Sequence, residues 1–339
     1  MDNKVLVTGG AGYIGSHTVW ELKRQGYSVT VLDNLSTGHK WAVKDTELVV
    51  GDVRDTHLLH SVFEKHSYQA VVHFAAKSIV ADSIKRPLEY YDNNVIGSQN
   101  LIRAVIQHDI PDFVFSSTAA VYGEPQHDAI SESHPTNPIN PYGKSKLMVE
   151  TILQDAATSY GLNVIAFRYF NAAGANPQAN LGEIHDPETH LIPNILSSAL
   201  ATQANGAVKI FGDDYETDDG TCIRDYVHVS DLAAAHAEAI QFLDSNPGHH
   251  VFNLGSQRGY SVLEVINACE RALGRDIAYE VSKRRAGDPS ILIADSTAVQ
   301  NAMNWEATQD IAQIVSDAAT FMIEGTPLRK RGKASIYIE

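Results

Sequence analysis

The chain has 339 residues, which is enough for a large core and two domains. Its formal charge of 26 − 41 = −15 argues against a nucleic-acid partner, because binding phosphates over a wide surface needs an excess of lysine and arginine. The longest apolar runs are too short to span a bilayer, so no membrane partner is expected.

The cysteine content and the first residues bear on location. Cys222 and Cys269 are too few for a disulfide framework and lack metal-ligand spacing, so the sequence predicts no metal site. A strand-like run begins almost at the first residue and leaves no room for a signal peptide. A cytoplasmic location is therefore expected.

Strand and helix signals alternate through the first half of the chain. Such alternation predicts a Rossmann-type, doubly wound parallel sheet with helices on both faces, in the α/β class. Strands are predicted at 4–10, 27–34, 46–53, 69–76, 112–118 and 162–171, and helices at 13–26, 56–67, 87–109 and 141–161.

The regular alternation of strand and helix signals ends at about Ala173. Two loop-rich segments, 174–190 and 211–225, flank a helix-like run at 191–204, and loops this long are usually functional. Amphipathic helices are expected at 261–274 and 310–325. We predict a nucleotide-binding domain over 1–173, to which later segments around 224–236 return, and a smaller C-terminal α/β substrate domain over 174–339.

A glycine-rich loop, "VTGGAGYIG", follows the first predicted strand and opens a helix. Gly10, Gly12 and Gly15 match the dinucleotide fingerprint, and Gly9 replaces Gly10 in its extended variant. The pyrophosphate is expected on the free N–H groups at the helix N-terminus. Asp33 ends the next strand, where a carboxylate would accept hydrogen bonds from a ribose diol and repel a 2′-phosphate. The sequence therefore favours NAD over NADP, the alternative being a simple glycine turn with an incidental aspartate.

Tyr142 and Lys146 lie four residues apart at the start of a predicted helix, so their side chains share one face. Making a tyrosine, with a pKa of about 10, a base near neutral pH costs about 4 kcal/mol. One cation about 4 Å away supplies roughly that energy at an effective dielectric near 20. Thr118, at the end of a predicted strand, is placed to hydrogen-bond a substrate hydroxyl. The alternative is a pair of solvated residues on a helix face.

These features together resemble the extended short-chain dehydrogenase/reductase family, most closely its UDP-glucose 4-epimerase members. The similar motifs cover nearly the whole chain and are "VTGGAGYIGSH", "PLEYYDNNV", "FSSTAAVYG", "PYGKSKLMVE", "RYFNAAGA", "THLIP", "IFGDDYETDDGTCIRDYVHVSDLA" and "RRAGDPS". The resemblance implies NAD-dependent interconversion of UDP-glucose and UDP-galactose through a transient 4-keto sugar. It also implies a homodimer formed through the helices that begin near Pro87 and Pro141.

The same resemblance assigns residue roles, with Tyr142, Lys146 and Thr118 as the catalytic set. The expected cofactor contacts are these three residues and Gly9, Gly12, Tyr13, Ile14, Gly15, Asp33, Asn34, Asp52, Val53, Phe74, Ala75, Asn93 and Phe170. The expected contacts to the UDP-hexose substrate are Asn171, His190, Leu191, Ile210, Phe211, Arg224, Tyr226, Arg285, Asp288 and Leu292.

Several positions depart from related proteins or separate the rival functions. Thr118 replaces a more common serine, and Lys77 is displaced by one position from a cofactor-contacting lysine. Leu292 is smaller than the tyrosine of some members, which suggests room for the N-acetyl group of UDP-hexosamines. Ala119 and Ala120 stand where 4,6-dehydratases carry Asp–Glu, which argues against dehydration, and a nucleotide-linked glucuronate decarboxylase is disfavoured similarly. A catalytically silent NAD-binding sensor remains an alternative.

Overall fold

The structure is a computed structural model that describes residues 3–201, 207–285 and 289–325. Its first half is built around a seven-stranded sheet in which every neighbouring pair is parallel. The strands are β1 (Lys4–Thr8), β2 (Ser28–Asp33), β3 (Glu47–Val50), β4 (Ala70–His73), β5 (Asp112–Thr118), β7 (Asn163–Tyr169) and β13 (His249–Leu254). Their spatial order, β13-β7-β5-β4-β1-β2-β3, changes direction between β1 and β4. The predicted Rossmann-type doubly wound sheet is thus confirmed.

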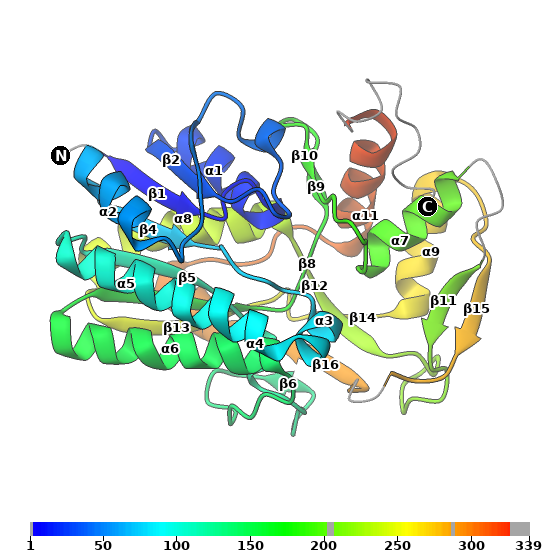
Figure 1. The fold of residues 1–339 in the computed structure, drawn as a ribbon. Coiled ribbons are helices and arrows are strands. Elements are labelled where there is room, and N and C mark those ends of the chain that lie inside the picture. The colour runs from blue at the N-terminus through cyan, green and yellow to red at the C-terminus, as the bar shows by residue number, and fades with distance from the viewer. Residues whose placement is uncertain (1–2, 202–206, 286–288, 326–339) are drawn as a thin grey trace.

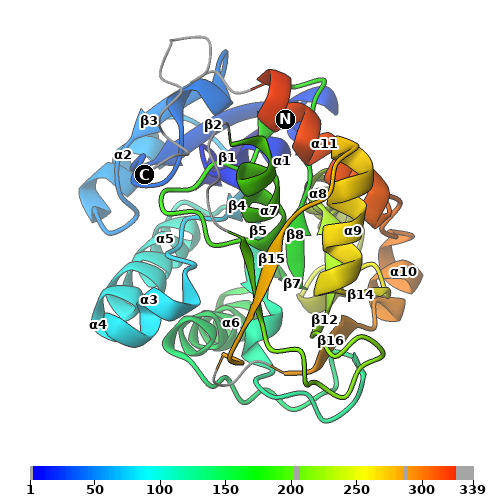
Figure 2. The ribbon, with the colours of Figure 1, turned by 90° about the vertical axis from the view of Figure 1, so that its right-hand side faces the viewer.

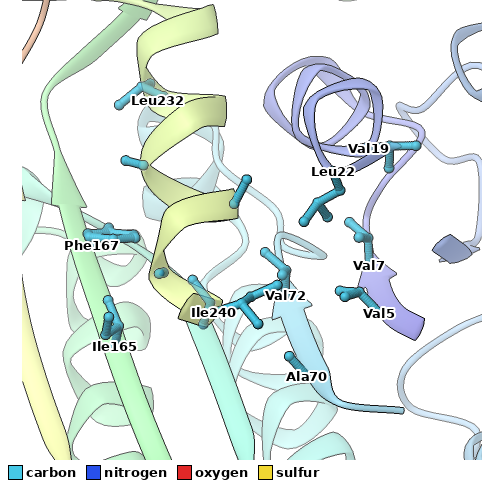
Figure 3. Packing of buried hydrophobic residues seen from close by; sticks show 14 of the residues in the cluster. Val5, Val7, Val19, Leu22, Ala70, Val72, Ile165, Phe167, Leu232 and Ile240 are labelled. Carbon is cyan, nitrogen blue, oxygen red and sulfur yellow. The ribbon is translucent and has the colours of Figure 1, made fainter. Parts of the chain in front are cut away.

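Helices cover both faces of this sheet (Figure 1). One face carries α1 (Tyr13–Arg24), α8 (Val229–Ser245) and α10 (Thr297–Met303), and the other carries α2 (Thr56–Lys65), α5 (Gly97–Gln107) and α6 (Pro141–Tyr160). Figure 3 shows Leu22 of α1 and Ile240 of α8 with Val5, Val7 and Val72 of the sheet. These side chains are fully buried, and each contributes about 1.5–3 kcal/mol through loss of contact with water.

The second half forms smaller sheets with their own helices. β12 (Ile223–His228) lies between β14 (Gly259–Ser261) and β16 (Ile291–Ala294), β16 also pairs with β6 (Ala129–Ile130), and β8 (Asn171–Ala173) also pairs with β12. β11 (Val208–Phe211) pairs with β15 (Tyr279–Ser282), and β9 (Ala175–Asn176) with β10 (Leu181–Gly182). The helices are α7 (Leu191–Leu200), α9 (Val262–Leu273) and α11 (Ile311–Thr320), followed by a π-helical turn, η4 (Phe321–Gly325). Figure 2 brings α7, α9 and β15 to the front.

The two halves are joined at the carboxyl ends of the large sheet. β7 ends at Tyr169 and β8 begins at Asn171, so the smaller sheets start where the parallel strands stop. The chain later returns, since α8 packs on α1 and β13 pairs with β7. Segment 224–236 is divided: β12 belongs to the smaller sheet, whereas α8 covers the large one. The boundary at Ala173 itself stays a prediction.

The helix predicted over 87–109 is interrupted. It consists of α4 (Pro87–Tyr90), a π-helical segment η2 (Tyr91–Ile96) and α5, and it is preceded by α3 (Val80–Lys85). The π-helical segment carries the buried Asn93 and Asn94. The Asn94 side chain donates to the Lys77 carbonyl at 2.9 Å and to the Ser145 hydroxyl at 3.0 Å. Such segments occur often at functional sites, and this one places side-chain amides against α6.

Candidate active site

The end of β5 and the first turn of α6 bring Thr118 and Tyr142 together. Thr118 is the last residue of β5 and leads into a short 3₁₀ helix, η3 (Ala119–Val121). α6 begins at Pro141, and the Asn140 side chain caps it by accepting from the Gly143 amide at 2.9 Å. This cap fixes Tyr142 in the first turn, with its phenol close enough to the Thr118 side chain for that hydroxyl to affect its pKa.

Burial controls the acidity of the Tyr142 phenol. Removal from water raises its pKa above the ordinary value, because the charged phenolate loses hydration. The neighbouring Thr118 side chain acts in the opposite direction and lowers the pKa of Tyr142 in part. The Thr118 hydroxyl is therefore placed to stabilise the phenolate, as well as to bind a ligand.

Lys146 lies one turn further along α6 and is buried. Its ammonium donates to the main-chain carbonyl of Ser116 at 2.7 Å and lies 4.9 Å from the centre of the Phe115 ring. Burial lowers the pKa of Lys146 to about 7, although the negative charge of Glu150 opposes this.

The electrostatic expectation for this pair is corrected in one respect. The sequence argument expected Lys146 to lower the pKa of Tyr142, but burial dominates and raises it. Burial also lowers the pKa of Lys146, so it disfavours the charged form of both side chains. The chain alone does not make a phenolate at neutral pH, and the further positive charge must arrive with a ligand.

The glycine loop between β1 and α1 has the close backbone packing that its spacing predicts. Gly9 has φ +71°, and a Cβ there would lie 2.5 Å from the Ala75 amide nitrogen. A Cβ on Gly15 would lie 2.3 Å from the Gly9 carbonyl oxygen, so the helix can approach the loop only without a side chain. A Cβ on Gly12 would come within 3.4 Å only of Gly9, and no side chain caps the start of α1. This open, positively polarised helix end fits the pyrophosphate of a dinucleotide.

Asp33 is tied to the same loop. One carboxylate oxygen accepts from the Ala11 amide at 2.9 Å, and the other accepts from the Leu35 amide at 2.8 Å. Each oxygen has a second lone pair, so hydrogen bonds to a ribose diol remain possible. Asp33 therefore shapes the glycine loop besides being a candidate ribose ligand.

Further predicted cofactor residues lie at the ends of β2, β3 and β4 and beside them. Asn34 donates to Asp52 at 2.9 Å, whereas Val53 is buried in the core, so its side chain is not available to a ligand. The Tyr13 hydroxyl donates to the Gly174 carbonyl at 2.7 Å, and the ring centre of Phe74 lies 4.7 Å from that of His236. The remaining predicted cofactor contacts are Ile14, Ala75, Asn93 and Phe170. Lys77 forms an ion pair with Glu89 at 2.6 Å, which gives it a partner within the chain.

The predicted substrate residues on β8, β12 and β16 lie side by side. Asn171 is the register partner of Tyr226, and its side chain donates to the Asp225 carbonyl at 3.0 Å. Arg224 is the register partner of Leu292. Leu292 and Phe170 both pack against the small apolar cluster that contains Ala119, immediately after Thr118. These strands thus connect the predicted catalytic residues with the predicted nucleotide site.

The other predicted substrate residues differ in accessibility. Arg285 stacks on the ring of Phe211, with its guanidinium carbon 3.9 Å from the ring centre. Ile210 is only 1% exposed and packs in the core of the second half, so a ligand could reach only its main chain. His190 precedes α7 and Leu191 is its first residue. Asp288 lies outside the described residues.

Two buried polar networks support the site and were not predicted. In the first, Glu150 of α6 accepts from Ser117 and pairs with Arg168 at 2.6 Å. Arg168 also donates to the Tyr122 hydroxyl at 3.1 Å, and that hydroxyl donates to Asn253 at 2.6 Å. The register of β5 and β7 sets Ser117 beside Arg168, and the packing of α6 on the sheet adds Glu150. No spacing in the sequence signals the network.

The second network runs beneath the glycine loop. His73 at the end of β4 contacts Thr8 of β1 at 2.6 Å and Ser98 of α5 at 2.8 Å. The Ser98 hydroxyl donates to the Asn94 carbonyl, and Asn94 reaches Ser145 of α6. Burial lowers the pKa of His73 to about 3, so this imidazole is neutral. The network joins β1, β4, α5 and α6 around the predicted site.

A third unpredicted group lies on the loop that precedes α7. Glu183, His185, Glu188 and His190 bring four side-chain ligand atoms within 4.8 Å of one another. The pattern E-x-H-x-x-E-x-H within "GEIHDPETH" could have indicated it.

Within the part of the chain that the structure describes, no helix is both long and apolar enough to cross a membrane.

Comparisons with known proteins agree with this geometry. Residues 5–255 match the NAD dependent epimerase/dehydratase family. A UDP-glucose 4-epimerase of Halalkalibacterium halodurans is 51% identical over 302 residues, which cover 89% of this chain and 90% of that protein. The crystal structure of UDP-glucose 4-epimerase from Brucella ovis with NAD is 45% identical with a TM-score of 0.90, and covers 93% of this chain and 97% of its own.

A third similar structure is the UDP-Glc/GlcNAc 4-epimerase of Campylobacter jejuni. It is 41% identical with a TM-score of 0.83, and the match covers 95% of this chain and 99% of that chain. The relationship predicted from the motifs is confirmed by these matches. The chain therefore belongs to the NAD dependent epimerase/dehydratase family, alongside the UDP-glucose 4-epimerases that it resembles over most of its length.

Proposed function

We propose that the protein is an NAD-dependent epimerase that interconverts UDP-glucose and UDP-galactose by inverting carbon 4 of the sugar. The observation that carries this proposal is the placement of Thr118, at the end of β5, beside Tyr142 in the first turn of α6, with Lys146 one turn on. The pair lies at the carboxyl ends of the parallel strands, where ligands of such sheets bind. The similarity to UDP-glucose 4-epimerases supports the choice of substrate.

In this proposal, residues 1–173 hold NAD and most of 174–339 holds the UDP-sugar. The cofactor residues are the glycine loop, Asp33 and the predicted contacts described above. A bound NAD supplies the hydride acceptor and donor for carbon 4 of the sugar. The chain's task is to hold the dinucleotide against the end of β5 and to keep water away from it.

The side chains manage the proton and the position of the sugar. Tyr142 takes the proton of the sugar 4-hydroxyl, and Thr118 aligns that hydroxyl and stabilises the phenolate. Lys146 supplies positive charge beneath the site from its contact with Ser116. Arg224 and Arg285 bind the diphosphate, since a guanidinium forms paired charge-assisted bonds with it. With the nucleotide held, the 4-keto sugar is free to turn and present its other face.

Dehydration, the rival chemistry in this family, is disfavoured by the residues that follow Thr118. Ala119 and Ala120 form the start of η3, directly beside the catalytic hydroxyls, and offer neither acid nor base. An elimination across carbons 5 and 6 needs both. The proposal is tested by incubating the protein with UDP-galactose without added NAD and identifying the product. UDP-glucose is expected, whereas a 4-keto-6-deoxy product or no turnover contradicts the proposal.

We also propose a homodimer and a cytoplasmic location. Ile84 of α3 and Leu88 of α4 are 64% and 79% exposed, and Met148 of α6 is also exposed. α3 and α4 both pack against α6, so these apolar side chains are offered by neighbouring helices that a second copy could cover. Leu88→Glu is then expected to give monomers by light scattering at a concentration where the wild type is dimeric. Two free cysteines, Cys222 and Cys269, are consistent with a reducing compartment.

A further inference from the structure

The loop between β10 and α7 gathers two carboxylates and two imidazoles around one point. Glu183, His185, Glu188 and His190 each offer one ligand atom, and these atoms all lie within 4.8 Å of one another. The loop lies between the large sheet and α9 (Figure 1). None of the proposed steps of the epimerase reaction uses the cluster as a whole, although His190 is a predicted substrate contact.

The distances match the size of a coordination shell. His190 Nδ1 lies 2.7 Å from Glu183 Oε1 and 3.0 Å from Glu188 Oε1. His185 Nδ1 lies 3.1 Å from Glu183 Oε1 and 3.7 Å from Glu188 Oε2. Ligand atoms bound at 2.0–2.2 Å in a tetrahedron are roughly 3.3–3.6 Å apart. The four distances lie on both sides of this spacing, and binding an ion would lengthen the two His190 contacts.

The charges require a positive partner at the centre. The side chains of Glu183 and Glu188 are 6% and 10% exposed, so two carboxylates share a poorly hydrated space. Such a pair must be compensated by cations. Two imidazolium groups would suffice, and so would one divalent cation with two neutral imidazoles. Charge alone does not distinguish these arrangements.

The direction of the His185 ring favours the cation. Its Nδ1 is buried and makes no hydrogen bond among the described residues, although Glu183 Oε1 is only 3.1 Å away. An imidazolium that paired with this carboxylate would direct its N–H along the line to the oxygen. Ligands of one metal ion instead point their lone pairs at the ion. Two ligand atoms can then lie close together although neither points at the other.

We propose that Glu183, His185, Glu188 and His190 bind one divalent transition-metal ion of the zinc class. Imidazole nitrogen and carboxylate oxygen suit Zn²⁺, and four protein ligands make a closed, structural site. The ion would fix this loop against α1, because the His185 ring packs edge-on against Tyr13 with centroids 6.4 Å apart. Tyr13 begins α1 directly after the glycine loop, and His190 directly precedes α7. The ion would thus join the predicted cofactor and substrate halves.

Binding is tested on the full-length protein after dialysis against a chelator. Zn²⁺ is titrated by calorimetry at pH 8, without nucleotide or sugar. The wild type is expected to bind one equivalent. Co²⁺ should give the intense visible absorption of a tetrahedral site. This test is independent of the proposed epimerase activity.

Variants separate the site from chance binding. Glu188→Gln keeps a carbonyl oxygen for the amides of Thr189 and His190 but weakens coordination, and His185→Ala removes a ligand. Each is expected to lower affinity at least tenfold. His108→Ala is the control, because His108 lies 3.0 Å from His60 in a separate histidine pair. No stoichiometric Zn²⁺ in the wild type, equal affinity in Glu188→Gln, or loss of binding in His108→Ala would overturn the proposal and leave the cluster as an ion-pair network.

Discussion

The ammonium of Lys146 donates a 2.7 Å hydrogen bond to the main-chain carbonyl of Ser116, two residues before Thr118, whose hydroxyl we propose to be catalytic. This contact holds a costly buried charge at the end of β5. A cation in this position does not improve the stability of the fold, since its own pKa is lowered to about 7 by burial. Its value must lie in the charge that it offers to a ligand and to Tyr142.

The free-energy cost of burying the charged Lys146 should appear as a pH dependence of the unfolding free energy. Because the pKa is about 7 in the folded protein and 10.5 ordinarily, the unfolded chain binds the extra proton between these values. Stability from this group therefore rises as pH increases from 7 towards 10. We expect the unfolding free energy of the wild type, relative to Lys146→Met, to increase between pH 7 and pH 9.5 in urea titrations. A difference that stays constant, or falls, would contradict the assignment.

The buried pair of Glu150 and Arg168 should matter more than any surface pair. Arg168→Met leaves the Glu150 carboxylate uncompensated, and the unfolding free energy is expected to fall by about 3–5 kcal/mol. The double replacement of Glu150 and Arg168 by methionine should recover part of this loss, because no buried charge remains. Arg86→Met, which breaks the exposed pair with Asp82, is the control and should destabilise the protein much less, because water screens this pair. Equal effects in denaturant titrations would refute the role of burial.

Gly12 tests the cofactor cradle with a small change to the loop. A Cβ there would meet only the Gly9 carbonyl oxygen, at 3.3 Å, whereas one on Gly15 would lie 2.3 Å from that oxygen. It would project from the open start of α1, where the pyrophosphate is expected. Gly12→Ala should fold normally and bind NAD at least about tenfold more weakly, a loss of roughly 1.4 kcal/mol. Gly161→Ala is the control: its φ of +73° strains the end of α6 without touching the cradle. If both variants retain NAD equally, the pyrophosphate lies elsewhere.

Leu292 is expected to set the size of the sugar pocket. It packs with Phe170 beside the cluster that follows Thr118. Leu292→Tyr adds bulk at this point and should lower turnover of UDP-N-acetylglucosamine by roughly tenfold or more. Turnover of UDP-galactose by the same variant is the internal control and should change much less. Absence of UDP-N-acetylglucosamine turnover in the wild type would refute the hypothesis directly.

The parallel sheet could be predicted because its strands are buried on both faces and appear as continuous apolar runs, such as "AVVH" in β4. The glycine loop and the pair of Tyr142 and Lys146 could be predicted because their chemistry depends on short spacings. The ion pair of Glu150 and Arg168 could not, since it depends on how α6 packs against β7, which no short spacing in the sequence indicates. The pKa of Tyr142 was expected in the wrong direction because spacing says nothing about burial.

The most direct test of the account replaces the Tyr142 hydroxyl alone. With UDP-galactose as substrate, Tyr142→Phe is expected to lose about 10²–10⁴-fold in kcat while its NAD content matches that of the wild type. Tyr160→Phe, at the exposed end of the same helix, should retain full activity. Undiminished formation of UDP-glucose by Tyr142→Phe would contradict the central claim that this phenol moves the proton of the sugar hydroxyl.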